Sequence, residues 1–128
     1  MVLGIAGGNG LEHIDKNKYQ KVYGIDINTE YLKAVEERYS DISEILECIQ
    51  VNLIDETSKL PNAELLVANL LIEYIGYDGF QKTVEHVCPK YVSCIIQINI
   101  DDSWVSGSPY IHVFIRLMKS ITKRRKIY

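Results

Sequence analysis

Residues 2–11 have the sequence Val-Leu-Gly-Ile-Ala-Gly-Gly-Asn-Gly-Leu, in which an apolar run leads directly into a cluster of glycines. A second apolar run follows at residues 21–26 and ends in the carboxylate of Asp26. A buried strand, a glycine turn that lets backbone approach a ligand, a helix and a second strand ending in an acid are the parts with which α/β folds hold an adenosine. The stretch therefore predicts an α/β fold with a nucleotide-type pocket.

Length and composition indicate a single globular domain over residues 1–128. Of the 128 residues, 47% are hydrophobic and 24% are charged, which is typical of soluble domains. The chain has neither a run of about 18 apolar residues that would cross a bilayer nor the basic and apolar segments of a signal peptide. We therefore expect a cytoplasmic protein without a membrane partner.

The cysteines give no sign of a metal site. Cys48, Cys88 and Cys94 are an odd number and form no Cys-x-x-Cys pair. Such spacing supports neither a disulfide framework nor a zinc site. We expect no bound metal and interpret all three as small, buried or half-buried side chains.

Charge is distributed unevenly along the chain, whose net charge is −3. All 17 acidic residues fall within residues 1–102, together with 8 basic ones, whereas residues 103–128 hold 6 basic residues and no acid. A basic end of this kind can contact nucleic acid. We favour a solvated terminal segment instead, because no aromatic platform or RNA-binding motif accompanies the charges.

The apolar pattern predicts five strands in alternation with helices. Strands are expected at residues 1–6, 21–26, 45–51, 63–68 and 91–100. Helices are expected at residues 11–17, from Asn28 or Thr29 to about 40, and from residues 76–79 to about 88. This order implies a three-layer αβα, Rossmann-like fold around a mostly parallel sheet of at least five strands. Residues 1–100 form that core, while the pattern of residues 101–128 does not distinguish a strand from a helix.

One expected helix carries a clear apolar stripe. Tyr31, Leu32, Val35 and Tyr39 recur at helical spacing, so we expect this helix to lie on the sheet through all four side chains.

The spacing of the glycines separates two kinds of adenosine cofactor. A dinucleotide turn, G-x-G-x-x-G, that starts at Gly8 would need a glycine where His13 stands, which disfavours a nicotinamide-dependent oxidoreductase. The rhythm Ala6-x-Gly8-x-Gly10, with Asp26 on the next strand, instead resembles motif I and the second-strand acid of class I S-adenosylmethionine-dependent methyltransferases. The resemblance covers about residues 1–100.

The resemblance implies where S-adenosylmethionine would bind. The methionine part would lie against the glycine turn, at Ala6, Gly7, Gly8 and Gly10, and amides at the start of the next helix would meet its carboxylate. Asp26 would accept hydrogen bonds from both ribose hydroxyls, and Ile27 would pack on the adenine. The alternative for Asp26 is a helix cap or a turn aspartate.

Three further positions match the family after the third and fourth strands. Asn52 would approach the adenine amino group, with the backbone of Leu53 beside the ring, although a simple turn asparagine also explains Asn52. Asn69 would line the methionine and methyl-transfer region.

Two positions depart from the family's pattern. Gly4 stands where the family commonly has an acid that braces the glycine loop and the cofactor's amino group, and Ala6 replaces the usual first glycine. We therefore expect weakened affinity for the cofactor.

Methyl transfer from a sulfonium is mainly a task of alignment, which explains why no catalytic residue can be identified. The resemblance implies an S-adenosylmethionine-dependent methyltransferase that acts on a small-molecule acceptor. The alternatives are a degenerate, non-catalytic cofactor-binding domain and an RNA methyltransferase that uses the basic C-terminal segment. The chain starts at its first expected strand and has roughly 28 residues after the fifth, so a minimal or truncated form, or a homo-oligomer that completes the pocket, is also open.

Overall fold

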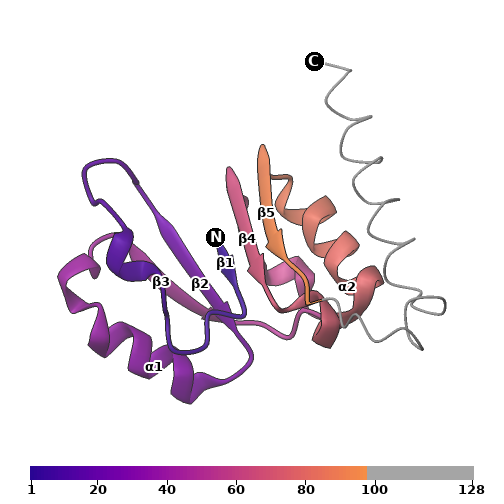
Figure 1. The fold of residues 1–128 in the computed structure, drawn as a ribbon, viewed down its shortest axis with the longest axis horizontal. Helices are drawn as coiled ribbons and strands as arrows, with labels where there is room; N and C mark the ends of the chain where they lie inside the picture. The colour runs from indigo at the N-terminus through magenta and orange to yellow at the C-terminus, as the bar shows by residue number, and fades with distance from the viewer. Residues whose placement is uncertain (98–128) are drawn as a thin grey trace.

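The computed structural model describes residues 1–97, which form a parallel β-sheet with helices on both faces (Figure 1). The strands are β1 (Val2–Leu3), β2 (Val22–Asp26), β3 (Leu46–Gln50), β4 (Leu65–Asn69) and β5 (Tyr91–Ile95). The α-helices are α1 (Thr29–Arg38) and α2 (Ile72–Val87), and single 3-10 turns are η1 (Leu11–His13), η2 (Ser40–Ile42) and η3 (Thr57–Lys59). The expectation of a Rossmann-like αβα fold is confirmed. Residues 101–128, for which no conformation was predicted, lie outside the described residues.

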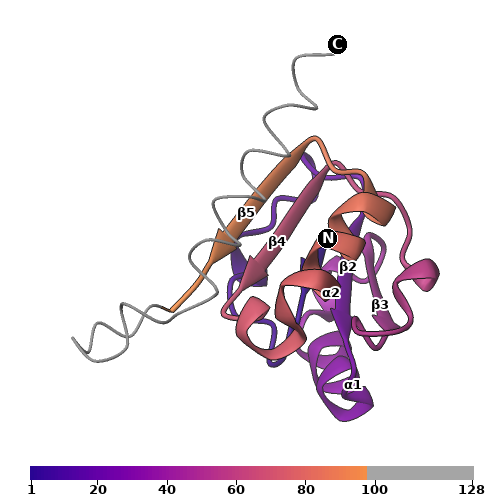
Figure 2. The ribbon, with the colours of Figure 1, turned by 90° about the vertical axis from the view of Figure 1, so that its right-hand side faces the viewer.

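The strand order is β3-β2-β1-β4-β5, and every neighbouring pair is parallel. From β1 the chain continues to one side of the sheet, and from β4 it continues to the other side (Figures 1 and 2). We call the adjacent carboxyl ends of β1 and β4 the switch point. In open α/β sheets, ligands bind outside the carboxyl ends of the strands at such a point. The topology therefore places the expected site outside the carboxyl ends of the strands, which we call the carboxyl edge of the sheet.

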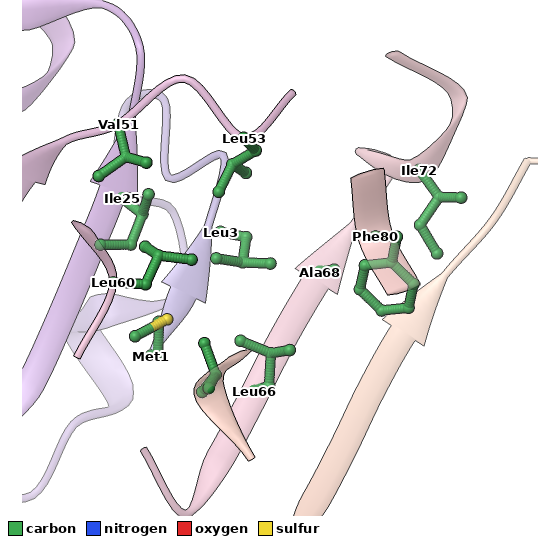
Figure 3. Close-up of a cluster of buried hydrophobic side chains, with 11 residues drawn as sticks. Met1, Leu3, Ile25, Val51, Leu53, Leu60, Leu66, Ala68, Ile72 and Phe80 are labelled. Carbon is green, nitrogen blue, oxygen red and sulfur yellow. The ribbon is translucent and has the colours of Figure 1, made fainter. Parts of the chain in front are cut away.

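Two apolar cores lie on opposite faces of the sheet. On one face, α2 packs its buried Phe80 and Val87 against Leu3, Leu66 and other strand residues (Figure 3). On the other face, the α1 residues Leu32 and Val35 pack with the other core, whose remaining buried members are Ile5, Leu11, Val22, Tyr39 and Ile42. Burial of apolar surface on both faces explains why the sequence of the inner strands β1 and β4 is a nearly continuous apolar run.

Strands β2 to β5 and helix α1 begin near their expected positions, and Asn28 caps α1 by accepting hydrogen bonds from the amides of Glu30 and Tyr31. The expected stripe of α1 is wrong at Tyr31, which is 48% exposed, because the buried row runs through Leu32 and Val35 instead.

The helix expected at residues 11–17 is reduced to the single turn η1. Asp15 ends it, because its carboxylate accepts a hydrogen bond from the amide of Asn17 and its carbonyl starts a new turn. The segment also has few apolar side chains with which a longer helix could cover the sheet.

Helix α2 begins at Ile72, earlier than expected, and Gly76 interrupts it. The backbone of Gly76 has φ 75° and ψ 167°, which no helical residue adopts. A short first turn therefore precedes the longer helix that packs on the sheet.

The glycine turn approaches α1 so closely at residue 8 that only a glycine fits there. A β-carbon at this position would lie 2.9 Å from Cε2 of Tyr39 and 3.1 Å from Cγ2 of Val35, and φ is +76°. Bare backbone here lets the turn sit directly on the buried side of α1.

Gly8→Ala is expected to lower the free energy of unfolding by about 1–3 kcal/mol, since the methyl group overpacks this contact and strains the backbone. Gly7→Ala is the matched control, because a β-carbon at Gly7 would have nothing within 4 Å, and we expect a change within about 0.5 kcal/mol. Urea denaturation followed by circular dichroism measures both. Equal losses in the two variants would contradict the packing role.

Candidate functional site

Asp26, the last residue of β2, joins three segments at the carboxyl edge of the sheet. Its Oδ2 accepts a hydrogen bond from the amide of Ala6 at 2.9 Å, and its Oδ1 accepts one from the amide of Asn28 at 3.0 Å. The carboxylate therefore holds the loop after β1 and the entry to α1 together. Each oxygen keeps a second acceptor position, because a carboxylate offers about four lone-pair sites. Asp26 can thus brace the loop and still accept hydrogen bonds from a ligand.

Strained backbone flanks the switch point. Ala6 has φ 45° and Leu70, directly after β4, has φ 54°, so both side-chain-bearing residues occupy the left-handed region. Such conformations are uncommon outside glycine, and they collect at binding sites, where surrounding contacts hold them. Here the contacts are the Asp26 carboxylate on the Ala6 amide and the Ile95 carbonyl on the Leu70 amide.

The end of α1 holds the glycine turn from the other side. Arg38 donates from Nη1 to the carbonyl of Gly7 and to Oδ1 of Asn9, both at 3.1 Å. The Tyr39 hydroxyl donates to Oε2 of Glu12 at 3.0 Å, and the same oxygen accepts from the amide of Gly10 at 2.8 Å. We call these three side chains, Arg38, Tyr39 and Glu12, the loop brace.

Electrostatics in the loop brace favour an ionised Glu12. Hydrogen bonds from the backbone amides of Glu12 and Gly10, together with the Tyr39 hydroxyl, hold the pKa of Glu12 below its ordinary value of 4.5. Burial first, and then the Glu12 contact, raise the pKa of Tyr39, which therefore stays a hydrogen-bond donor. The pair is a charge-assisted hydrogen bond at neutral pH.

The members of the glycine turn are placed differently from one another. Ala6, Gly7 and Gly10 are exposed, and a β-carbon at Gly7 or Gly10 would have nothing within 4 Å, so their backbone faces open space. Gly8 is buried, and its bare α-carbon faces protein. The amides of Gly8 and Leu11 donate to carbonyls within the turn, and that of Gly10 donates to Glu12.

Apolar side chains lie exposed at the carboxyl edge, on either side of Asp26 and beyond it. Ile27 is 59% exposed after β2, Ile54 is 61% exposed after β3, and Leu70 is 48% exposed after β4. The side-chain amide of Gln50 donates from Nε2 to the carbonyl of Ile27, which ties Ile27 to the end of β3. A purine nucleoside needs an apolar surface for its base and hydrogen-bond acceptors for its ribose hydroxyls. The exposed aliphatic side chains and the Asp26 carboxylate provide these two features.

The remaining sequence-predicted residues lie at the same edge in separate roles. Asn52 forms a local turn, in which its Oδ1 accepts from the amide of Ile54 and its own amide donates to Glu56. The side chain of Leu53 is buried in the α2 core. Asn69 is exposed at the end of β4, one register position beyond the Leu3–Ala68 pair.

Sequence reasoning missed the loop brace and the contact of Leu71 with Gly4. A β-carbon at Gly4 would lie 2.8 Å from Cδ1 of Leu71, so the Leu71 side chain occupies the space beside Gly4. The helical stripe flagged Tyr39, but nothing in the pattern indicated that it reaches the glycine turn.

Among residues 1–97, no group of three or more His, Cys, Asp or Glu side chains could hold a metal ion. Cys48 and Cys94 are half-buried, and burial raises the pKa of Cys48 to about 11. Cys88 is exposed, so the expectation that all three cysteines are covered is wrong there. No helix in the described part of the chain has the length and apolar character that a membrane span requires.

Comparisons with known proteins agree with the topology. No protein-family model matches the sequence, and no curated protein matches it. A solved structure, the methyltransferase domain of bacterial CtHen1-C, superposes with a TM-score of 0.57 at 21% identity. The match covers 71% of this chain and 52% of that one, so the chain spans about half the length of its structural neighbour. The chain therefore has a Rossmann-like fold of the class I methyltransferase type.

The pH dependence of stability tests the loop brace. A carboxylate with a lowered pKa stabilises the folded state above its ordinary pKa of 4.5, and this contribution is lost as the pH falls through the folded value. Glu12→Gln is expected to be less stable than the wild type at neutral pH, with the difference shrinking in acid. Urea titrations at several pH values measure it. A deficit that is the same at every pH would contradict the ionised brace.

Proposed function

We propose that this chain is a methyltransferase domain that binds S-adenosylmethionine at the carboxyl edge of its sheet and methylates a small-molecule acceptor. The observation that carries the proposal is Asp26, which stands at the end of β2 and bonds to the strained loop after β1. This arrangement occurs next to the switch point of a class I methyltransferase-like fold.

The residues at this edge fit the adenosine part of the cofactor. The remaining acceptor positions of Asp26 suit the two ribose hydroxyls, and the exposed Ile27 and Ile54 offer apolar surface to a purine. Open backbone at Gly7 lets a ligand approach without meeting a side chain. Asn69 is the last residue of β4, at the switch point, where it would face the reacting end of the cofactor.

The bound cofactor would supply a methyl group already activated by its sulfonium. The chain's own contribution is then to hold the nucleoside, orient the reacting end and admit an acceptor, which is catalysis by proximity. Tyr74, in the first turn of α2, is 83% exposed at this edge and can shape the acceptor side.

Calorimetric titration with S-adenosylmethionine and S-adenosylhomocysteine tests the cofactor. We expect saturable binding of both, because the two share the adenosine part for which the edge provides partners. Transfer of a labelled methyl group to small-molecule acceptors then tests turnover. Absence of binding at millimolar ligand would refute the cofactor, whereas binding without transfer would favour the non-catalytic cofactor-binding domain.

Asp26→Ala is expected to weaken binding of S-adenosylhomocysteine by about 1–3 kcal/mol, since charge-assisted hydrogen bonds to the ribose are lost. Asp41→Ala serves as the control, because Asp41 lies in η2, on the return from α1 to the start of β3, away from the carboxyl edge. Circular dichroism establishes that both variants fold. Unchanged affinity in folded Asp26→Ala would remove Asp26 from the site.

A further inference from the structure

We propose that this site recognises the adenosine half of its ligand and that, among residues 1–97, it offers the amino-acid half no charged partner. The ligand class is then the 5′-thioadenosines in general, and not only those that carry an amino acid. The inference rests on the proposed function and specifies which part of the ligand is recognised. Two separate features support it, one at Gly4 beside the switch point and one in the glycine turn, and each concerns one charge of the amino-acid group.

The first feature concerns the ammonium of the amino-acid group. Between β1 and β4, the space beside Gly4 is taken by the aliphatic side chain of Leu71, whose Cδ1 would lie 2.8 Å from a β-carbon on residue 4. Residues 1–11 include no acid. The first acid after β4, Glu73, is held toward the end of β5, away from β1, because its Oε1 accepts a hydrogen bond from the backbone amide of Gln97 at 2.6 Å. An ammonium placed here meets Leu71 where a carboxylate would be needed to compensate its desolvation.

The second feature concerns the carboxylate of the amino-acid group. Backbone amides in a glycine turn are natural partners for an anion. In this chain the Gly10 amide already donates to the Glu12 carboxylate, and the Tyr39 hydroxyl fixes that carboxylate in place. The Gly8 and Leu11 amides donate to carbonyls of the turn itself. A ligand carboxylate at the Gly10 amide would have to displace Glu12 or lie beside its like charge, which disfavours binding there. The nearby Arg38 guanidinium is already engaged by the Gly7 carbonyl and by Oδ1 of Asn9.

The part of the carboxyl edge that would hold the nucleoside, by contrast, has groups available to bind it. Asp26 keeps acceptor positions for hydroxyl groups, and Ile27 and Ile54 keep exposed apolar surface for a base. Binding energy is therefore concentrated on ribose and adenine.

The test compares two ligands on the whole wild-type chain by calorimetry. S-adenosylhomocysteine and 5′-methylthioadenosine share the nucleoside and the thioether, and only the first carries the amino acid. We expect their dissociation constants to agree within about tenfold, since a charge-assisted contact to the amino acid would contribute tenfold or more. A preference above tenfold for S-adenosylhomocysteine would overturn the inference and leave the proposed function intact. Failure of both ligands to bind would overturn the proposed function, and the inference with it.

A double variant tests the same idea by adding the missing charge. Leu71→Ala makes room beside residue 4, and Gly4→Asp adds a carboxylate there. Aspartate is one of the residues that tolerate a positive φ such as the +61° at this position. We expect the double variant to prefer S-adenosylhomocysteine at least tenfold more strongly than the wild type does. Leu71→Ala alone, which makes room without adding charge, should keep the wild-type ratio. An unchanged ratio in the folded double variant would contradict the role of this position.

Discussion

The arrangement of the carboxyl edge depends on one carboxylate. Asp26 must end β2 where both of its oxygens meet backbone amides, that of Ala6 in the loop after β1 and that of Asn28 at the start of α1. These two bonds hold the loop after β1 against the end of β2. They also fix Asn28, which caps α1. The strained φ of Ala6 persists because this bond and the packing around it hold the loop.

The loop after β1 has two different roles. It packs tightly on α1, which Gly8 permits by its contact with Tyr39, and in the proposed function it also keeps backbone open to a ligand, which Gly7 provides. The loop brace allows both, since Arg38 bonds the loop from α1 and Glu12 bonds it from η1, while Gly7 and Gly10 stay exposed. Glu12 also occupies the Gly10 amide, so stability of the loop and recognition of an anion would compete for one donor.

Apolar periodicity was enough to predict the order of strands and helices, because parallel strands buried on both faces and an amphipathic α1 leave a direct record in sequence. The position of Asp26 at the end of β2 was predicted for the same reason. The short η1 was missed, because the turn at Asp15 depends on a local side-chain bond that competes with a helix. The Leu71 contact with Gly4 joins residues 67 positions apart, and nothing local records such a meeting.

Gly76 divides α2 into a short first turn and a longer second part that packs on the sheet. Its φ of 75° and ψ of 167° belong to a region open only to glycine, so the helical register before it is not transmitted to the residues after it. Phe80 and Val87 anchor the later part in the core, while Tyr74 stands 83% exposed on the earlier turn. Substitutions in the turn that borders the carboxyl edge can therefore change that surface without disturbing the core.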